Sequence, residues 1–166
     1  LTSGDYNVAV GHNSQTATTT GGENVSIGRE SLDSNTTGSS NVAVGNGALQ
    51  SSVTGNNNTA IGYRALYVAT VGDNTAVGHT ALTANTTGAD NTAVGYQALL
   101  TNATGANNTA SGFRSLYSNT TGSSNVASGY QSLFSNTTGS NNVASGWNSL
   151  VNNTTGANNV ASGHQS

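Results

Sequence analysis

Three histidines are the residues with the clearest potential for chemistry, because imidazole binds metals and transfers protons. His12, His79 and His164 each follow the glycine of a recurring five-residue motif, so in stacked repeats they lie about 19 and 24 Å apart, at about 4.8 Å per repeat. One chain therefore cannot bring them to a single metal. A trimer with this position near its axis could gather three copies of one histidine as a ligand set. The position also holds Arg29 and Asn46, so we favour variable exposed residues and predict no metal site.

The acidic residues form no catalytic arrangement. Glu30 and Asp33 are close in sequence but lie beside Arg29, which is typical of a solvated cluster. Regular calcium-binding repeats need an aspartate in each turn, and only Asp73 and Asp90 meet that need. The chain has no lysine, so its glycine-rich turns lack the residue that a phosphate-binding loop requires. We predict that the chain is not an enzyme and has no cofactor.

The composition excludes several classes of partner. Charged residues make up 5% of the chain, against a usual figure of about 25%, and the net charge is -3. Such a surface offers no electrostatic attraction for nucleic acid or anionic lipid. No apolar run is long enough to insert into a membrane. The absence of cysteine excludes disulfides and suits an extracellular location, at a cell or virion surface.

The motif Asn-(Val/Thr)-(Ala/Ser)-(Val/Ile/Ser)-Gly occurs ten times and defines the architecture. Eight of its nine steps are 17 residues and one, Asn58 to Asn74, is 16. A repeat this short predicts an all-β solenoid, a parallel β-roll in which each repeat is one coil, with residues 1–166 as a single domain. We number each coil from its asparagine as position 1, so coil one begins at Asn7 and coil ten at Asn159. At about 4.8 Å per coil the rod is roughly 48 Å long.

Two glycine columns, at positions 5 and 15, divide each coil into two segments. Both segments, at positions 1 to 5 and 7 to 12, are expected to be short strands. Glycine suits the corners because it adopts positive φ without a Cβ penalty. The position-5 turn glycines include Gly45, Gly62, Gly78, Gly95, Gly112, Gly129 and Gly146.

The most restricted apolar columns are alanine at position 3 and leucine at position 9. We favour placing both inside the coil, with alanine allowing two sheets to approach closely, so that positions 2 and 4 form a flat outer strip. The alternative places positions 2 and 4 inside. Thr109 and Ser111 would then share one core, which is costly unless their hydroxyls are bonded.

Asparagine at positions 1 and 12 can form amide ladders along the rod. Six position-12 asparagines also match the N-glycosylation pattern Asn-x-Thr, and we favour a role in the turn over glycosylation. These are Asn35, Asn85, Asn102, Asn119, Asn136 and Asn153.

Aromatic residues recur at positions 6 and 10 of coils four to nine, where stacking would make an apolar ridge. We favour packing between subunits as its role and keep contact with a host-surface glycan or protein receptor as the alternative. The residues of this aromatic ridge are Tyr63, Tyr67, Tyr96, Phe113, Tyr117, Tyr130, Phe134 and Trp147.

The repeat resembles a known family. Asn-Val-Ala-Val-Gly-x-x-Ala at 41–48 is similar to the head repeats of YadA-like trimeric autotransporter adhesins, and the longer form at 129–142 is similar to repeats of phage tail fibres. The resemblance implies a left-handed β-roll packed side by side as a homotrimer. The 17-residue coil is longer than the typical adhesin coil. No stalk, membrane anchor or capping element is visible, so we expect a segment of a longer fibre or a unit that stacks into a filament.

Three functions remain open from the sequence. The leading one is a structural and adhesive extracellular fibre segment, such as an adhesin head or a tail-fibre shaft. The second is an ice-binding solenoid, for which Thr59, Thr75, Thr92 and Thr109 form part of a regular row. The third is a subunit that assembles end to end into an extracellular filament.

Overall fold

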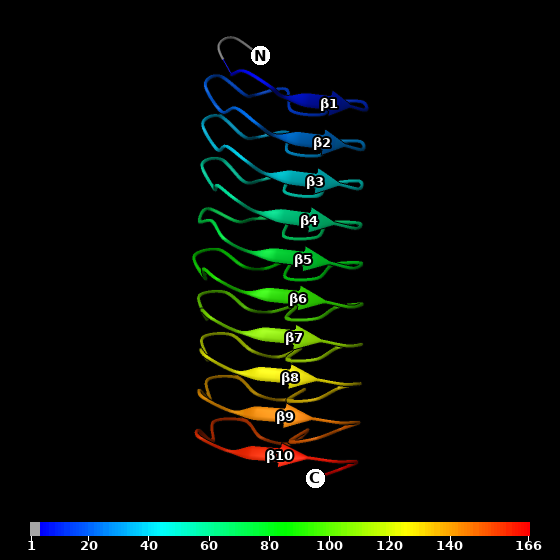
Figure 1. Ribbon diagram of the computed structural model, residues 1–166, viewed down its shortest axis with the longest axis vertical. Coiled ribbons are helices and arrows are strands. Elements are labelled where there is room, and N and C mark those ends of the chain that lie inside the picture. The colour runs from blue at the N-terminus through cyan, green and yellow to red at the C-terminus, as the bar shows by residue number, and fades with distance from the viewer. Residues whose placement is uncertain (1–3) are drawn as a thin grey trace.

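The chain folds into a rod built on one parallel β-sheet. A computed structural model describes residues 4–166 and contains ten three-residue strands, hydrogen-bonded in chain order. The strands lie one above another along the rod, and loops close each coil on either side of them (Figure 1). They are β1 (Val8–Val10), β2 (Val25–Ile27), β3 (Val42–Val44), β4 (Thr59–Ile61), β5 (Thr75–Val77), β6 (Thr92–Val94), β7 (Thr109–Ser111), β8 (Val126–Ser128), β9 (Val143–Ser145) and β10 (Val160–Ser162). The predicted β-solenoid is confirmed.

Every strand pairs with its neighbour in the register of the sequence repeat. Ala43 faces Ala60 across β3 and β4, and Ala60 faces Ala76 across β4 and β5. The second pair spans the 16-residue step, so the missing residue does not shift the sheet. It is instead absorbed in the turn before Gly72, because the Val71 carbonyl accepts from the Asn58 amide at 3.1 Å, as the Gly55 carbonyl at position 15 accepts from Asn41 at 2.8 Å.

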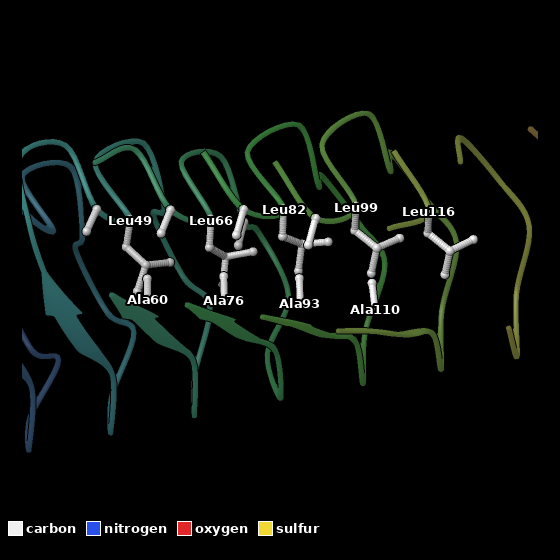
Figure 2. Packing of buried hydrophobic residues seen from close by; sticks show 14 of the residues in the cluster. Leu49, Ala60, Leu66, Ala76, Leu82, Ala93, Leu99, Ala110 and Leu116 are labelled. Atoms are coloured by element: carbon white, nitrogen blue, oxygen red, sulfur yellow. The ribbon is translucent and has the colours of Figure 1, made fainter. Parts of the chain in front are cut away.

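The favoured inward face is confirmed. The position-3 alanines of β3 to β9 and the position-9 leucines from Leu32 to Leu133 are fully buried, whereas positions 2 and 4 are exposed or partly exposed. Each leucine points at the alanine of the next coil, as Leu49 does at Ala60 and Leu99 does at Ala110 (Figure 2). A methyl-sized partner is needed there because the coil is too narrow for two large side chains.

The expected second strand of each coil is wrong. Positions 6 to 11 form turns, and the backbone is left-handed at positions 7 and 9, with φ of 50° at Leu49 and 49° at Arg64. This conformation costs a non-glycine residue about 1–2 kcal/mol. It also turns positions 8 and 9 inward together, as at Ala48 and Leu49, which a strand cannot do. Residues 4–166 contain one sheet, and position-3 alanine faces turns rather than a second sheet.

These turns keep the backbone satisfied by bonding between coils. The Leu32 N–H donates to the Ala48 carbonyl at 3.0 Å, and the Ser34 N–H donates to the Gln50 carbonyl at 3.0 Å. Buried peptide groups need such partners, and the next coil supplies them at most of these turn positions.

The glycine columns lie where neighbouring coils touch backbone to backbone. Gly112 has φ of 136°, and a Cβ built on it would lie 2.4 Å from the Gly129 oxygen in the next coil. Gly105, at position 15, would place a Cβ 2.3 Å from the Gly122 oxygen. Any side chain would force the coils apart.

The predicted asparagine ladders are confirmed in both columns. At position 1, the Asn125 side-chain amide donates to Asn108 Oδ1 at 3.1 Å and to the Gly139 carbonyl at 2.9 Å. At position 12, the Asn119 amide donates to Asn102 Oδ1 at 2.7 Å and to the Gly122 carbonyl at 2.9 Å. The interior is therefore a polar network as well as an apolar core, and the asparagine amides of both columns are hydrogen-bonded.

Candidate interaction surface

The aromatic residues at position 6 form a continuous column of stacked rings. Neighbouring ring centroids lie 4.5–5.8 Å apart and their planes differ by 5–23°. The in-register sheet causes this stacking, because it places position 6 of each coil directly above position 6 of the last. This ring stack consists of Tyr63, His79, Tyr96, Phe113, Tyr130, Trp147 and His164.

Two histidines belong to the ring stack, which the sequence analysis did not anticipate. His79 lies between Tyr63 and Tyr96 at 5.0 and 5.3 Å, and His164 lies 4.5 Å from Trp147. Their place in the stack could have been predicted, because both histidines occupy position 6, which holds an aromatic residue in most neighbouring coils. Within residues 4–166 no group of three His, Asp or Glu residues could hold a metal.

A second aromatic column lies beside the ring stack at position 10. Tyr117 and Phe134 stack at 5.0 Å. Arginines at position 7 lie between the two columns: the Arg114 guanidinium is 5.2 Å from the Phe113 ring and 5.4 Å from the Tyr117 ring. Arg64 bridges Tyr63 and Tyr67 in the same way, at 5.6 and 5.1 Å. These cation–π contacts tie the two columns of the ridge together.

The stacking decides which part of each ring a partner can reach. Tyr96, Phe113 and Tyr130 remain about 40% exposed, although rings on both sides cover their faces. A partner therefore meets ring edges and tyrosine hydroxyls. Sugars stack on free ring faces, whereas edges suit the aliphatic and aromatic groups of a protein surface.

The outer strip of the sheet continues the apolar surface next to the ring stack. It consists of positions 2 and 4 of all ten strands, which hold only valine, threonine, isoleucine and serine. Its exposed large apolar side chains are Val8, Val10, Ile27, Ile61, Val94, Val126, Val143 and Val160. The strip carries no charge, so a second copy of it would meet no electrostatic repulsion.

The remaining polar candidates do not form a catalytic site. Glu30 pairs with Arg29 at 2.7 Å at the rod surface and also accepts from Gln50 at 3.2 Å. Asp33 accepts from the Thr16 hydroxyl in the coil before it. These groups link adjacent coils and gather around no cavity.

Five of the six predicted Asn-x-Thr asparagines are fully buried, and Asn153 is partly buried. Their amides belong to the position-12 ladder, so a glycan cannot be attached to them in the folded rod.

A hollow lies near the C-terminal end of the described chain. Its walls include Leu150 and Asn153, the core positions 9 and 12 of coil nine. Its lining is made of amide, hydroxyl and aliphatic side chains, and it carries no convergent set of functional groups.

Comparisons with known proteins add no relative. No family model, no curated protein and no solved structure matches the chain. In the described part of the chain there is no helix long and apolar enough to cross a membrane. The case for function therefore rests on the fold and on the surface formed by the outer strip and the aromatic ridge.

Proposed function

We propose that this chain is part of an extracellular fibre in which copies of the rod pack side by side through the outer strip and the aromatic ridge. One observation carries the proposal: the sheet is entirely parallel, has ten strands, and is covered on only one face. Parallel sheets in proteins are nearly always covered on both faces. A partner packed on the outer strip would cover the second face of this sheet.

The chemistry of the strip favours a second copy of the chain as that partner. Monomeric soluble proteins rarely expose a contiguous apolar patch larger than a few hundred Å². Here exposed valines or isoleucines lie on β1, β2, β4, β6, β8, β9 and β10, and the edges of Tyr96, Phe113 and Trp147 extend the patch sideways. Two rods of the same coil spacing match each other along their whole length. The trimeric stoichiometry comes from the resemblance of the repeat to trimeric adhesin heads.

An assembled rod of this kind is suited to projecting a surface away from a cell or virion. Its length grows by about 4.8 Å for every 17 residues, and its coils expose few charges to unspecific ionic partners. Binding to a host-surface receptor would use the faces left open by subunit packing.

Native molar mass by light scattering tests the association. We expect a species near three times 16.4 kDa. Val94→Lys places a charge on the outer strip and is expected to give monomers, whereas the control Thr121→Lys, on an exposed turn at position 14, leaves the mass unchanged. A wild-type chain that stays monomeric at all concentrations contradicts the proposal, and particles that grow without limit indicate an end-to-end filament.

Ice binding is a second candidate, and a column of exposed threonines favours it. Position 14 is an exposed threonine in eight coils, at Thr20, Thr37, Thr54, Thr87, Thr104, Thr121, Thr138 and Thr155. The neighbouring position-13 hydroxyls are already committed, since Thr120 Oγ1 donates to the Thr137 carbonyl at 3.0 Å. Thermal hysteresis that Thr104→Lys abolishes would support this function, and a wild-type rod without hysteresis or ice shaping would exclude it.

A further inference from the structure

The rod has a weak joint at coils three and four, where several independent contacts between coils fail together. We call residues 52–74 the seam. On its C-terminal side, the position-12 ladder is continuous: Asn102, Asn119, Asn136 and Asn153 each donate to the asparagine of the coil before, at 2.7–2.9 Å. In the seam the column holds Ser52 and Ala69. Ser52 Oγ is buried without a partner, and no amide link joins Asn35 to Asn85.

The position-1 ladder weakens in the same coils. Asn41 donates its side-chain amide to Asn24 Oδ1 at 3.0 Å, and Asn91 donates to Asn74 Oδ1 at 3.3 Å. Between them, the Asn58 amide keeps only its bond to the Val71 carbonyl within coil four, and the Asn74 amide, at the start of coil five, turns back to the Gly72 carbonyl of coil four. Only the backbone bonds to the ladder remain, from the N–H groups of Asn58 and Asn74 at 3.0 and 3.1 Å.

The backbone on the turn side of the coils also loses bonds at the seam. Elsewhere the position-13 N–H donates to the next coil, as Thr36 does to Val53 at 2.9 Å, and so does position 11, as Ser51 does to Tyr67 at 2.9 Å. In the described chain the corresponding N–H groups of Val53 and Val68 have no such bond. Val53 also lacks the hydroxyl with which Thr86 and Thr120 bond the next coil.

The sheet and the apolar core pass through the seam unbroken. Strands β3, β4 and β5 remain in register, and Leu49, Leu66 and Leu82 remain buried in one row (Figure 2). The coils are therefore held at the seam by the sheet, the core and isolated bonds such as that of Thr70 Oγ1 to the Thr86 carbonyl at 2.7 Å, without the continuous amide ladders that join coils five to nine.

In a solenoid each repeat contacts only its neighbours, so the weakest interface sets where cooperative unfolding stops. We propose that the seam divides the rod into two unfolding units, coils one to three and coils five to ten, and that the rod opens there before it opens elsewhere. The division belongs to the fold of the single chain and holds whether or not the chain forms fibres. In a fibre, the seam would confine local unfolding to the coils on one side of it.

Hydrogen exchange followed by mass spectrometry tests the division. We expect a step in protection at the seam, with amides of coils one to three exchanging at least roughly tenfold faster than the equivalent amides of coils five to eight. A smooth decline in protection from the middle of the rod toward both ends would overturn the proposal, because it would indicate fraying alone.

Two variants separate the seam from any effect of the chain ends. The repair variant combines Ser52→Asn, Val53→Thr and Ala69→Asn with a serine inserted after Gly72, and it is expected to remove the step. The transplant variant combines Asn119→Ser, Thr120→Val and Asn136→Ala with deletion of Ser140, and it is expected to create a new step at coils seven and eight. A step that persists at coil four in the repair variant would overturn the proposal. The repair variant adds contacts, so misfolding does not confuse its result.

Discussion

The side-chain amide of Asn119 donates to Asn102 Oδ1 at 2.7 Å, and both side chains are fully buried. The same link recurs between successive coils up to Asn153. Each oxygen accepts from the next coil and each amide donates to the coil before, so the directional hydrogen bonds of this ladder fix the register in which successive coils stack. The apolar core, made of alanine and leucine, has no directional contacts and could not fix this register alone.

Removing one rung of this ladder should destabilise the rod. Asn119→Ala leaves the Asn102 oxygen without the Asn119 donor, and it leaves the Asn136 amide with only the Gly139 carbonyl of its two acceptors. Since both groups stay buried, we expect the free energy of unfolding to fall by about 1–3 kcal/mol. Chemical denaturation measures this, with Thr121→Ala as a matched control on the exposed turn. Equal stabilities of the two variants would contradict a structural role for the ladder.

A methyl group on the position-5 glycine column should be far more damaging. Gly112→Ala places a Cβ against the Gly129 backbone, in a region of φ that side chains avoid. We expect a loss of at least about 3 kcal/mol or failure to fold, measured by circular dichroism and denaturation.

The control for this change is Gly47→Ala. Gly47 has φ of 68°, at a position where other coils carry side chains, and its nearest neighbours are the flexible side chains of Gln50 and Arg64. We expect a loss of about 1–2 kcal/mol, from the left-handed backbone alone. If Gly112→Ala were equally well tolerated, the coils would be less closely stacked than described.

The ring stack should contribute to stability through ring contact as well as through apolar area. Phe113→Leu keeps an apolar side chain but separates the Tyr96 ring from the Tyr130 ring, so we expect a loss of about 1 kcal/mol. Phe113→Tyr retains the ring and should leave the denaturation midpoint unchanged. A leucine variant as stable as the tyrosine variant would mean that stacking adds nothing beyond burial.

Production in a glycosylating secretory host should distinguish buried from exposed acceptor sites. Asn107 lies in the sequence Asn-Asn-Thr and is exposed, whereas Asn119 in Asn-Thr-Thr is buried. Glycopeptide mapping of the folded fraction should find glycans on Asn107 and none on Asn119. A folded rod with a glycan on Asn119 would contradict the ladder.

Much of the fold was predictable because the same residue type recurs at equivalent positions of successive repeats. Alanine at position 3 and leucine at position 9 recur at fixed spacing, and stacking in register turns such a recurrence into a continuous buried row, as at Ala60 and Leu66. The asparagine ladders follow from the same argument.

The second strand was not predictable by alternation, and the reason is visible at Ala48 and Leu49. Adjacent positions 8 and 9 are both restricted to inward-facing residues, which conflicts with the two-residue period of a strand. That conflict indicates a turn rather than a strand. The left-handed conformation of leucine could not be predicted in the same way, because non-glycine residues rarely adopt it.

The surface was predictable in part. The aromatic residues were identified by column, but the place of His79 among them depends on ring geometry. The shortened step after Asn58 was visible in the sequence. Its effect on the Asn74 amide, which turns back to the Gly72 carbonyl, depends on hydrogen bonds that a sequence does not specify.

The most direct test of the central claim is the solvent accessibility of Trp147, the single tryptophan of the chain. Trp147 is 42% exposed in the isolated rod and lies in the aromatic ridge. If copies pack through the outer strip and the ridge, acrylamide quenching of its fluorescence should fall with rising protein concentration, in step with molar mass. Val94→Lys should keep the high quenching of the free rod. An assembly in which Trp147 remains as accessible as in the monomer would contradict the account.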